Sequence, residues 1–482
     1  MTTIKLDPGA ALLLDALHGA GHAAYAVGGC VRDSLLGLAP HDWDLCTSAR
    51  PEQVMALFGE EKCIPTGLQH GTVTVKQGGR LYETTTFRTE GAYSDGRHPD
   101  AVCFVPDVRE DLARRDFTIN AMAYSAEEGL IDPFGGRDDL AAHLVRAVGE
   151  PERRFEEDAL RILRLYRFAA RFGFAIDPAT GAAARALGPH LDCVSAERIQ
   201  EELLKLLAAP RPGSYLEPAV LAVILPELEP EKQPERFAEL CRIIDRIEPT
   251  AENVPTRLAA LLCPLGEAGA RKALRKLKCS NALTDEVTAL EREAGGGAGS
   301  FLLGHEFELR HPADALCLER HSHPAGRCPN SNSLFPPQAA VVAVAGHSIA
   351  RPIAFGNRVP PQRTVLRETT VTPDFTIYAR RLLGKYNLCT VQRLAALGTA
   401  LQPERSADFA ALSELAEQLD ADGVCCRVSQ LAVNGRDLMA AGVPAGPGIR
   451  KVLEALLDGV IREEYPNERQ ALLIAVQQLA AS

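Results

Sequence analysis

The chain has 482 residues, of which 46% are hydrophobic and 24% charged, with a formal net charge of −11. This composition is that of a soluble globular protein, and the length predicts three or four domains. No uncharged apolar run of about 18 residues occurs and no apolar signal core follows Met1, which excludes membrane and secreted classes and predicts the cytoplasm. Thirteen scattered cysteines in such a chain predict free thiols. The negative charge does not exclude a nucleic-acid partner, because binding depends on where positive charge gathers.

The first informative element is a glycine pair at the end of a predicted strand. Residues 23–27 are short, apolar and β-prone, and a helix is predicted over 31–36, so Gly28 and Gly29 occupy the turn between them. Backbone amides point outward at such a turn and a helix N-terminus favours anions, which makes the turn a candidate phosphate cradle. Taken alone, a glycine pair is more often an ordinary turn.

Two acidic residues follow on a second predicted strand, residues 41–47. Asp42 and Asp44 are two positions apart, and residues at i and i+2 share one face of a strand. Paired carboxylates aimed at one spot are the ligands that a pair of Mg²⁺ ions needs to activate a hydroxyl and stabilise a leaving pyrophosphate. An isolated Asp-x-Asp is usually a solvated strand end, but its position after the glycine turn predicts nucleotidyl transfer.

The strand predicted over 81–87 carries a third acidic residue, Glu83. If this strand lies beside 41–47, Glu83 is a third carboxylate of the metal site; an exposed strand residue is the equally weighted alternative. Arg115, at the start of a predicted helix, is a candidate for binding a triphosphate, because a guanidinium pairs strongly with phosphate. The other predicted strands are 71–76 and 101–104.

From about residue 150 the apolar spacing becomes helical, and the helix predicted over 153–172 places arginines on one face. Asp158 lies one turn before Arg161 and beside it. A helix built for salt bridges would alternate the sign of charge along this face. A lone Asp–Arg pair at the head of an arginine row instead suits a contact with a base followed by contacts with phosphates. The arginines of this row are Arg161, Arg164, Arg167 and Arg171.

Composition divides the chain into five parts. A mixed α/β domain is expected over 1–148, helical domains over 149–210 and 211–294, a Gly/Pro/His-rich insertion over 295–375 and a helical domain over 376–482. In the insertion a poorly structured segment is favoured over a zinc site, because the spacing matches no common zinc module. The zinc ligands considered are Cys317, His321, His323 and Cys328. The later predicted helices are 196–208, 234–247, 256–262 and 269–277.

Four of these motifs, in this order, resemble those of the class II tRNA nucleotidyltransferases, the CCA-adding enzymes, of the bacterial type that lacks an HD phosphohydrolase domain. The resemblance covers residues 1 to about 280 and returns in the tail at 431–438 and 442–447. The four motifs are Gly28-Gly29-x-Val31-Arg32-Asp33, Asp42-x-Asp44, Arg115-Asp116-Phe117-x-x-Asn120-Ala121 and Glu157-Asp158-x-x-Arg161.

The resemblance implies an α+β protein in which a nucleotidyltransferase head (1–148) precedes an all-helical neck (149–210), body (211–294) and tRNA-binding tail (376–482). It implies addition of C, C and A to tRNA 3′ ends from CTP and ATP with Mg²⁺, and no obligate protein partner is evident. By similarity, the residues with roles are Asp42 and Asp44 as metal ligands, Gly28, Gly29, Arg32 and Arg115 as nucleotide contacts, and Asp158 and Arg161 as base readers with Arg164 and Arg167 nearby.

Three alternatives stay open. Bacterial poly(A) polymerases share the head and neck motifs, although residues 65–72 resemble the CCA-adding version. Addition of A alone is a second alternative, whereas residues 88–99 resemble the flexible loop that CC-only members lack. A non-catalytic RNA-binding protein is the third, and intact Asp42 and Asp44 argue against it, because binding alone does not require paired metal carboxylates. The chain has Leu261 to Leu265 where an HD pair is expected, so no phosphodiesterase activity is predicted.

Overall fold

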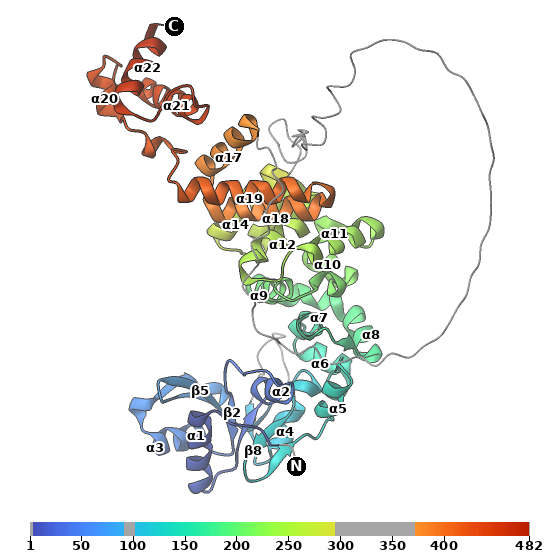
Figure 1. The fold of residues 1–482 in the computed structure, drawn as a ribbon. Coiled ribbons are helices and arrows are strands. Elements are labelled where there is room, and N and C mark those ends of the chain that lie inside the picture. Colours follow the sequence, from blue (N-terminus) through green and yellow to red (C-terminus); the bar gives the residue numbers. More distant parts are fainter. Residues whose placement is uncertain (1–2, 91–101, 295–371, 482) are drawn as a thin grey trace, which may run out of the picture. The chain divides into compact units, whose positions relative to one another are not determined.

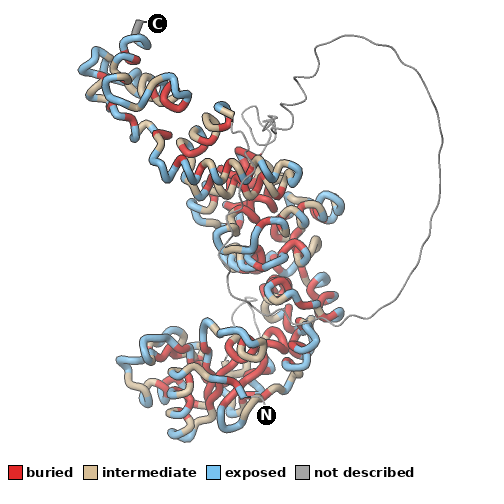
Figure 2. The backbone as a smooth tube through the Cα atoms, viewed as in Figure 1, coloured by how far each residue is buried: buried red, intermediate tan, exposed pale blue. Residues whose placement is uncertain are grey.

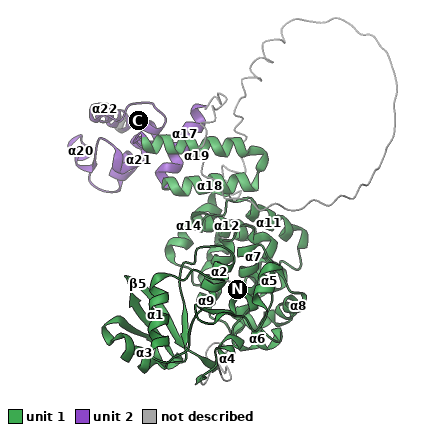
Figure 3. Ribbon diagram, turned by 60° about the horizontal axis from the view of Figure 1, so that its bottom comes forward, with its two compact units in different colours: residues 1–305, 386–421 green, residues 306–385, 422–482 purple. Residues whose placement is uncertain are grey.

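The computed structural model describes residues 3–90, 102–294 and 372–481 (Figure 1). The chain forms two compact units, one of residues 1–305 and 386–421 and the other of residues 306–385 and 422–482 (Figure 3). The four candidate zinc ligands of the insertion, and most of the predicted flexible loop, fall outside the described residues. The predicted fold class is confirmed, because a mixed α/β sheet domain precedes a largely helical remainder.

The N-terminal part of the first unit is built on a seven-stranded sheet with the order β3-β4-β5-β2-β1-β8-β9. Neighbouring strands are antiparallel except β2 and β5, which run parallel. All four residues of β1 are buried, as its unbroken apolar character predicts. The strands are β1 (Ala24–Val27), β2 (Leu45–Thr47), β3 (Cys63–Gly67), β4 (Thr72–Gln77), β5 (Arg80–Thr86), β8 (Ala123–Ser125) and β9 (Gly129–Ile131).

A tight hairpin sets the register of this sheet. Gly78 and Gly79 have φ of 57° and 79°, values that favour glycine, and form the two-residue turn between β4 and β5. Gln77 pairs with Arg80 next to the turn, and β5 then runs parallel to β2. Short strand pairs lie outside the sheet: β6 (Arg88–Glu90) with β7 (Val102–Phe104), and β10 (Leu144–Val145) with β11 (Ala175–Ile176).

Helices pack on the sheet and close its core. Tyr25 and Val27 of β1 join Phe87 and Leu112 in one buried apolar cluster. Figure 2 shows buried residues in red. The first helix begins after Asp7, whose carboxylate accepts the N–H of Gly9 at 3.0 Å and so caps the helix. These helices are α1 (Pro8–Gly19), α2 (Gly29–Leu35), α3 (Pro51–Phe58), α4 (Val108–Ala113) and α5 (Gly136–Ala141).

One predicted helix is two helices. The segment 153–172 breaks at Asp158, whose backbone is extended (φ −148°, ψ 103°), into α6 (Pro151–Glu157) and α7 (Leu160–Phe172). The Asp158 carboxylate Oδ1 accepts the N–H of Leu160 at 3.1 Å, so it caps the start of α7. A short polar side chain that bonds the backbone locally competes with helix continuation, which the apolar periodicity does not reveal.

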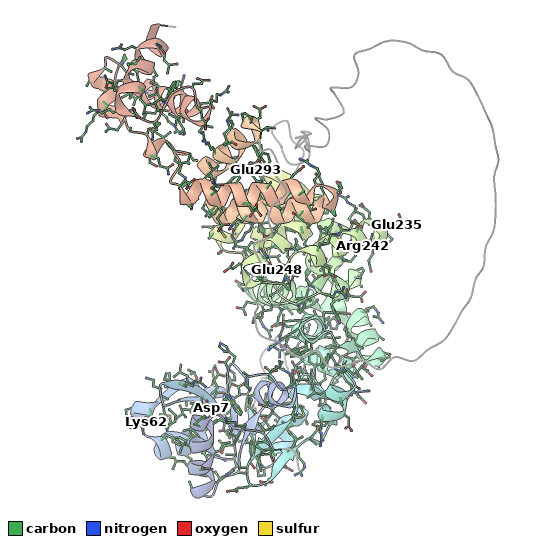
Figure 4. All side chains as sticks on the ribbon, in the orientation of Figure 1. Asp7, Lys62, Glu235, Arg242, Glu248 and Glu293 are labelled. Atoms are coloured by element: carbon green, nitrogen blue, oxygen red, sulfur yellow. The ribbon has the colours of Figure 1, made fainter. Side chains whose placement is uncertain are left out.

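The remaining helices of the first unit form a layered bundle. Helix α14 packs on α12, α13 and α18. Glu293 of α14 (Figure 4) accepts a hydrogen bond from Tyr386 at 2.8 Å, which ties the 386–421 segment to the same unit. The helices are α8 (Pro178–Leu187), α9 (Ala196–Leu207), α10 (Pro218–Ile224), α11 (Pro234–Arg246), α12 (Val254–Leu262), α13 (Gly266–Lys276), α14 (Asn281–Ala294), α18 (Leu388–Leu401) and α19 (Ser406–Ala421).

The second unit is small and helical in its described residues. Leu438, Leu456 and Leu472 lie in its buried apolar core, and Asn434 caps α20 by accepting the N–H of Arg436 at 2.9 Å. Its helices are α17 (Pro373–Lys385), α20 (Gly435–Ala440), α21 (Pro447–Ile461) and α22 (Arg469–Ala481).

Two expectations from composition can be compared with the described residues. Every cysteine among them is a free thiol, as predicted. None of their helices is both long and apolar enough to cross a membrane. The five-part domain division stays a prediction.

Candidate active site

The two aspartates lie just before a strand. We predicted a strand over 41–47, but β2 begins at Leu45, so Asp42 and Asp44 belong to the segment that leads into it, and both are exposed. Leu45 pairs in parallel register with Thr84 of β5. One step back along both strands, Asp44 and Glu83 are neighbours. The strand arrangement that would bring Glu83 to the two aspartates is therefore present.

The electrostatics of Asp44 reflect this crowding of carboxylates. Although Asp44 is open to solvent, desolvation by the surrounding protein and the negative charges of Glu83 and Asp42 raise the pKa of its carboxyl to about 6, against the opposing charge of Arg115. A carboxylate in this setting is stabilised by a cation, and oxygen donors are what Mg²⁺ prefers. The chemistry of the donor set therefore fits a divalent metal.

The geometry of the donor set is not preassembled. Within the described residues, no three His, Cys, Asp or Glu side chains already converge on one metal position. Asp42 is 82% exposed and its carboxylate lies 3.0 Å from Nδ1 of His41, its chain neighbour. The metal ligands would have to converge when a cation arrives.

The glycine turn and Arg115 form one structural unit. Gly28 has φ of 77°, and a Cβ there would lie 2.8 Å from Nη1 of Arg115, so both conformation and space require glycine. The N–H of Gly28 donates to the carbonyl of Met122 at 3.0 Å, so this amide is already used and the predicted cradle lacks it. Helix α2 begins at Gly29 and not at Val31 as predicted.

Arg115 retains hydrogen-bonding capacity. Its Nη2 lies 3.6 Å from Asp111, and its buried Nε has no hydrogen-bond partner among the described residues. Its charge also acts on Asp44. Arg115 thus links the glycine turn to the carboxylates, as a residue that binds the phosphates of a nucleotide should.

Arg32 occupies a different environment from the one expected of a nucleotide contact. Its side chain is only 4% exposed, it donates to Asp33 at 2.8 Å and to Asn120, and its guanidinium lies 4.8 Å from the ring centre of Phe172. Desolvation lowers the pKa of Arg32 while Asp33 opposes this change. In this structure Arg32 joins α2 to α7 inside the protein, and its contact with a nucleotide stays a prediction.

The predicted pair of base readers has other partners. Asp158 accepts a hydrogen bond from Nη2 of Arg198 at 2.8 Å. Arg161 instead pairs with Glu157 at 2.7 Å and donates to the backbone carbonyl of Arg114 at 3.1 Å. Because the helix breaks at Asp158, the two residues do not occupy successive turns of one helix, and the expected Asp–Arg pair is replaced by two separate ion pairs.

The arginine row continues in the same way. Arg164 donates two hydrogen bonds to Asp116, at 2.6 and 2.9 Å. Although desolvation opposes it, the charge of Arg164 holds the pKa of Asp116 well below its ordinary value. Arg167, whose side chain is only 10% exposed, pairs with Glu202 of α9. Carboxylates from distant elements pair with both Arg164 and Arg167, so neither is free in this structure, and their contact with phosphates stays a prediction.

Four charged residues were missed as parts of this neighbourhood: Asp33, Asp116, Arg198 and Glu202. Asp33 and Asp116 lay inside motifs but carried no assigned role. Arg198 and Glu202 are four positions apart on a helix that was predicted correctly, so the sequence places them on one face but does not say what they meet.

Comparison with known proteins identifies the family of the chain. Three family descriptions match: the poly A polymerase head domain over residues 24–146, the probable RNA and SrmB-binding site of polymerase A over 173–232, and a putative tRNA nucleotidyltransferase domain 2 over 369–476. The CCA-adding enzyme of Lactobacillus helveticus is 43% identical over 277 residues, which cover 57% of this chain and 68% of that enzyme. That of Leuconostoc citreum is 45% identical over 257 residues, covering 53% and 63%.

A solved structure extends the likeness along the whole chain. The crystal structure of the Bacillus stearothermophilus CCA-adding enzyme in complex with CTP has 29% sequence identity and a TM-score of 0.69, covering 99% of this chain and 98% of that one. From the sequence identity and the shared fold together, the chain belongs to the family of CCA-adding enzymes.

Proposed function

We propose that this protein adds C, C and A to the 3′ end of tRNA, using CTP and ATP and releasing pyrophosphate. The observation that carries the proposal is the register of β2 against β5, which sets Asp44 beside Glu83. Arg115 lies against the glycine turn, and its charge acts on Asp44. The names of the relatives and the CTP complex of the Bacillus enzyme support the same reaction. The same site must accept CTP when C is added and ATP when A is added.

Nucleotidyltransferases generally use divalent metal ions, and we propose Mg²⁺ held by Asp42 and Asp44 with Glu83 beside them. When bound, the metal would favour ionisation of the tRNA 3′ hydroxyl and offset charge on the leaving pyrophosphate. Arg115 would bind the triphosphate through its free donor capacity. The exposure of Asp42 and Asp44 leaves room for water and substrate oxygens on the metal.

Base choice rests on hydrogen-bond polarity. Cytosine and adenine each present an amino donor beside a ring-nitrogen acceptor, whereas uracil and guanine present a carbonyl beside a ring N–H. Asp158 only accepts and Arg161 only donates, so together they match the first pattern and oppose the second. Arg161 is held by Glu157 and a backbone carbonyl, and Asp158 by Arg198, so both would meet the base from fixed positions.

The proposed partners are tRNA, CTP and ATP, and the reaction belongs in the cytoplasm, where these meet. The head, neck, body and tail boundaries of 1–148, 149–210, 211–294 and 376–482 are part of the proposal, with the tail as a tRNA-binding domain.

The test uses purified protein with tRNAs that end before the CCA sequence, after the first C and after CC. CTP and ATP are supplied separately and together, and the products are sequenced. The proposal expects CC from CTP alone, completion by ATP, and arrest after one A. Extension of the first tRNA by neither nucleotide would contradict it.

Poly(A) addition is the second candidate, because the head matches the poly A polymerase head domain over residues 24–146. A poly(A) polymerase would add many A residues to any of the three tRNAs. An enzyme that adds only A would extend the tRNA ending in CC by one A and leave the others unchanged with CTP. The same product sequences separate all three activities.

A further inference from the structure

Helix α9 places two charged side chains against the candidate base readers. Arg198 and Glu202 are four residues apart and therefore lie on one face of the helix, which packs directly on α7 (Figure 1). Arg198 donates to Asp158 at 2.8 Å, and Glu202 pairs with Arg167.

The contact to Asp158 restricts how this carboxylate is turned. Its Oδ1 accepts the N–H of Leu160 at 3.1 Å, and its Oδ2 accepts Nη2 of Arg198 at 2.8 Å. Each carboxylate oxygen can accept about two hydrogen bonds, so both retain capacity for a ligand. The side chains of Asp158 and Arg198 are 15% and 23% exposed, so the pair is enclosed by protein but not sealed from a ligand.

The helix that carries Arg198 is itself fixed. Arg257 of α12 is fully buried and donates to the carbonyl of Leu207 at 2.6 Å and to that of Ala209 at 2.5 Å, at the C-terminal end of α9. These carbonyls lie in the last turn of α9 and just after it, where backbone carbonyls have no hydrogen-bond partner within the helix. Arg198 therefore acts on Asp158 from a helix anchored to the rest of the unit.

We propose that Arg198 is a positioning residue for base selection, which holds the Asp158 carboxylate in the one orientation that accepts an amino group of cytosine or adenine. The inference rests on the proposed function and deepens it. With Arg198 removed, Asp158 keeps only its bond to the Leu160 amide and can rotate. A rotated carboxylate also accepts the ring N–H of uracil, so discrimination against UTP falls.

The test compares the incorporation of CTP and of UTP by wild-type protein and by Arg198→Met. The substrate is tRNA that lacks the CCA end, and Mg²⁺ is present. We expect the ratio of kcat/KM for CTP to kcat/KM for UTP to fall about tenfold. The fall should come mainly from a higher KM for CTP and a higher kcat/KM for UTP. Arg198→Lys should recover part of the ratio, because it keeps a donor near Asp158. Lys205→Ala is the matched control: Lys205 lies on α9, is exposed and pairs only with Glu201 among the described residues.

A double-mutant cycle separates positioning from simple stabilisation. If Arg198 acts through Asp158, adding Arg198→Met to Asp158→Asn should change the CTP-to-UTP ratio less than twofold. Independent, multiplying effects would overturn the inference. So would an unchanged ratio in Arg198→Met with a lowered unfolding midpoint, which is the result for a purely structural pair. If Arg198→Met does not fold, Arg198→Leu, which also lacks a donor, is tested by the same criterion.

A second readout keeps this inference distinct from the proposed function. Equilibrium binding of CTP and of UTP with Mg²⁺, measured without tRNA, reports base selection alone. If wild-type protein prefers CTP in binding but transfers nothing to tRNA, the proposed function fails and the binding ratio of Arg198→Met still decides the inference. If wild-type protein binds CTP and UTP equally, the inference is overturned.

Discussion

The head and the neck treat their charged residues in opposite ways. Asp42, Asp44 and Glu83 are exposed, and the charges nearest to Asp44 include two carboxylates that repel it. The neck arginines Arg161 and Arg167 are enclosed and paired with carboxylates. The head therefore keeps charge available for a metal and a nucleotide, whereas the neck uses charge to fix the shape that meets the base. Loss of Asp44 from the head should remove activity, and loss of Glu202 from the neck should lower stability.

The largest expected effect on activity is in the head. Asp44→Asn should lower the rate of CTP incorporation on the order of 10²–10³-fold, the size found when one preorganised electrostatic contact to a transition state is lost. The unfolding midpoint should not fall, because Asp44 is exposed and its ionised carboxylate is repelled by Glu83 and Asp42. Initial rates and thermal unfolding measure the two effects. Asp15→Asn, an exposed acid on α1, is the control; near-normal turnover of Asp44→Asn would break the assignment of the head.

Loss of a buried carboxylate in the neck should lower the free energy of unfolding. Glu202→Gln removes the carboxylate that Arg167 pairs with in a buried position, and leaving a buried charge without its partner costs roughly 3–5 kcal/mol. Denaturant unfolding followed by circular dichroism measures the loss. Glu201→Gln on the same helix is the control, since Glu201 is exposed. Equal midpoints for the two variants would show that the buried neck pairs do not stabilise the fold.

Asp158 should affect the choice of nucleotide. Asp158→Ala should lower the use of CTP and ATP and narrow their advantage over UTP and GTP by about 1–3 kcal/mol, with Mg²⁺ dependence unchanged. Relative incorporation of the four nucleotides by folded Asp158→Ala protein measures this effect. Unchanged selectivity with reduced stability would place Asp158 with the structural pairs of the neck and would move base choice elsewhere.

A buried acidic residue differs from the charged residues of both the head and the neck. Glu291 of α14 is buried, and neither of its carboxylate oxygens has a hydrogen-bond partner among the described residues. Burial raises the pKa of Glu291 from 4.5 to about 8. The folded protein thus keeps this carboxyl protonated up to about pH 8, whereas the unfolded chain releases the proton above pH 4.5. The contribution to stability is full below pH 4.5 and is lost as pH rises to about 8.

This titration predicts a change of stability with pH. Between pH 6 and pH 8 wild-type protein should lose roughly 2 kcal/mol of stability relative to Glu291→Gln, which has no proton to release. Unfolding of both proteins at the two pH values measures the difference. Parallel pH profiles would mean that Glu291 ionises in the folded protein at an ordinary pKa.

The sequence predicts the head better than the neck for a physical reason. The glycine turn, the Asp42–Asp44 pair and the β-prone strands are local patterns, and the structure differs mainly in where β2 and α2 begin. The arginines of α7 pair with carboxylates that lie far away in the sequence, and only the fold brings them together. These carboxylates are Asp33 of α2, Asp116 and Glu202 of α9. The break at Asp158 follows from one side-chain hydrogen bond to the backbone, which helical periodicity does not reveal.

The most direct test of the central claim is metal binding at the head. Mn²⁺, as a paramagnetic substitute for Mg²⁺, can be titrated by electron paramagnetic resonance in the presence of CTP, with wild-type protein and Asp44→Asn compared at the same nucleotide concentration. We predict that Asp44→Asn weakens the binding of Mn²⁺ to the protein by about tenfold or more while the protein stays folded. Equal Mn²⁺ affinity in the two proteins would contradict the claim that the open carboxylates of the head hold the metal.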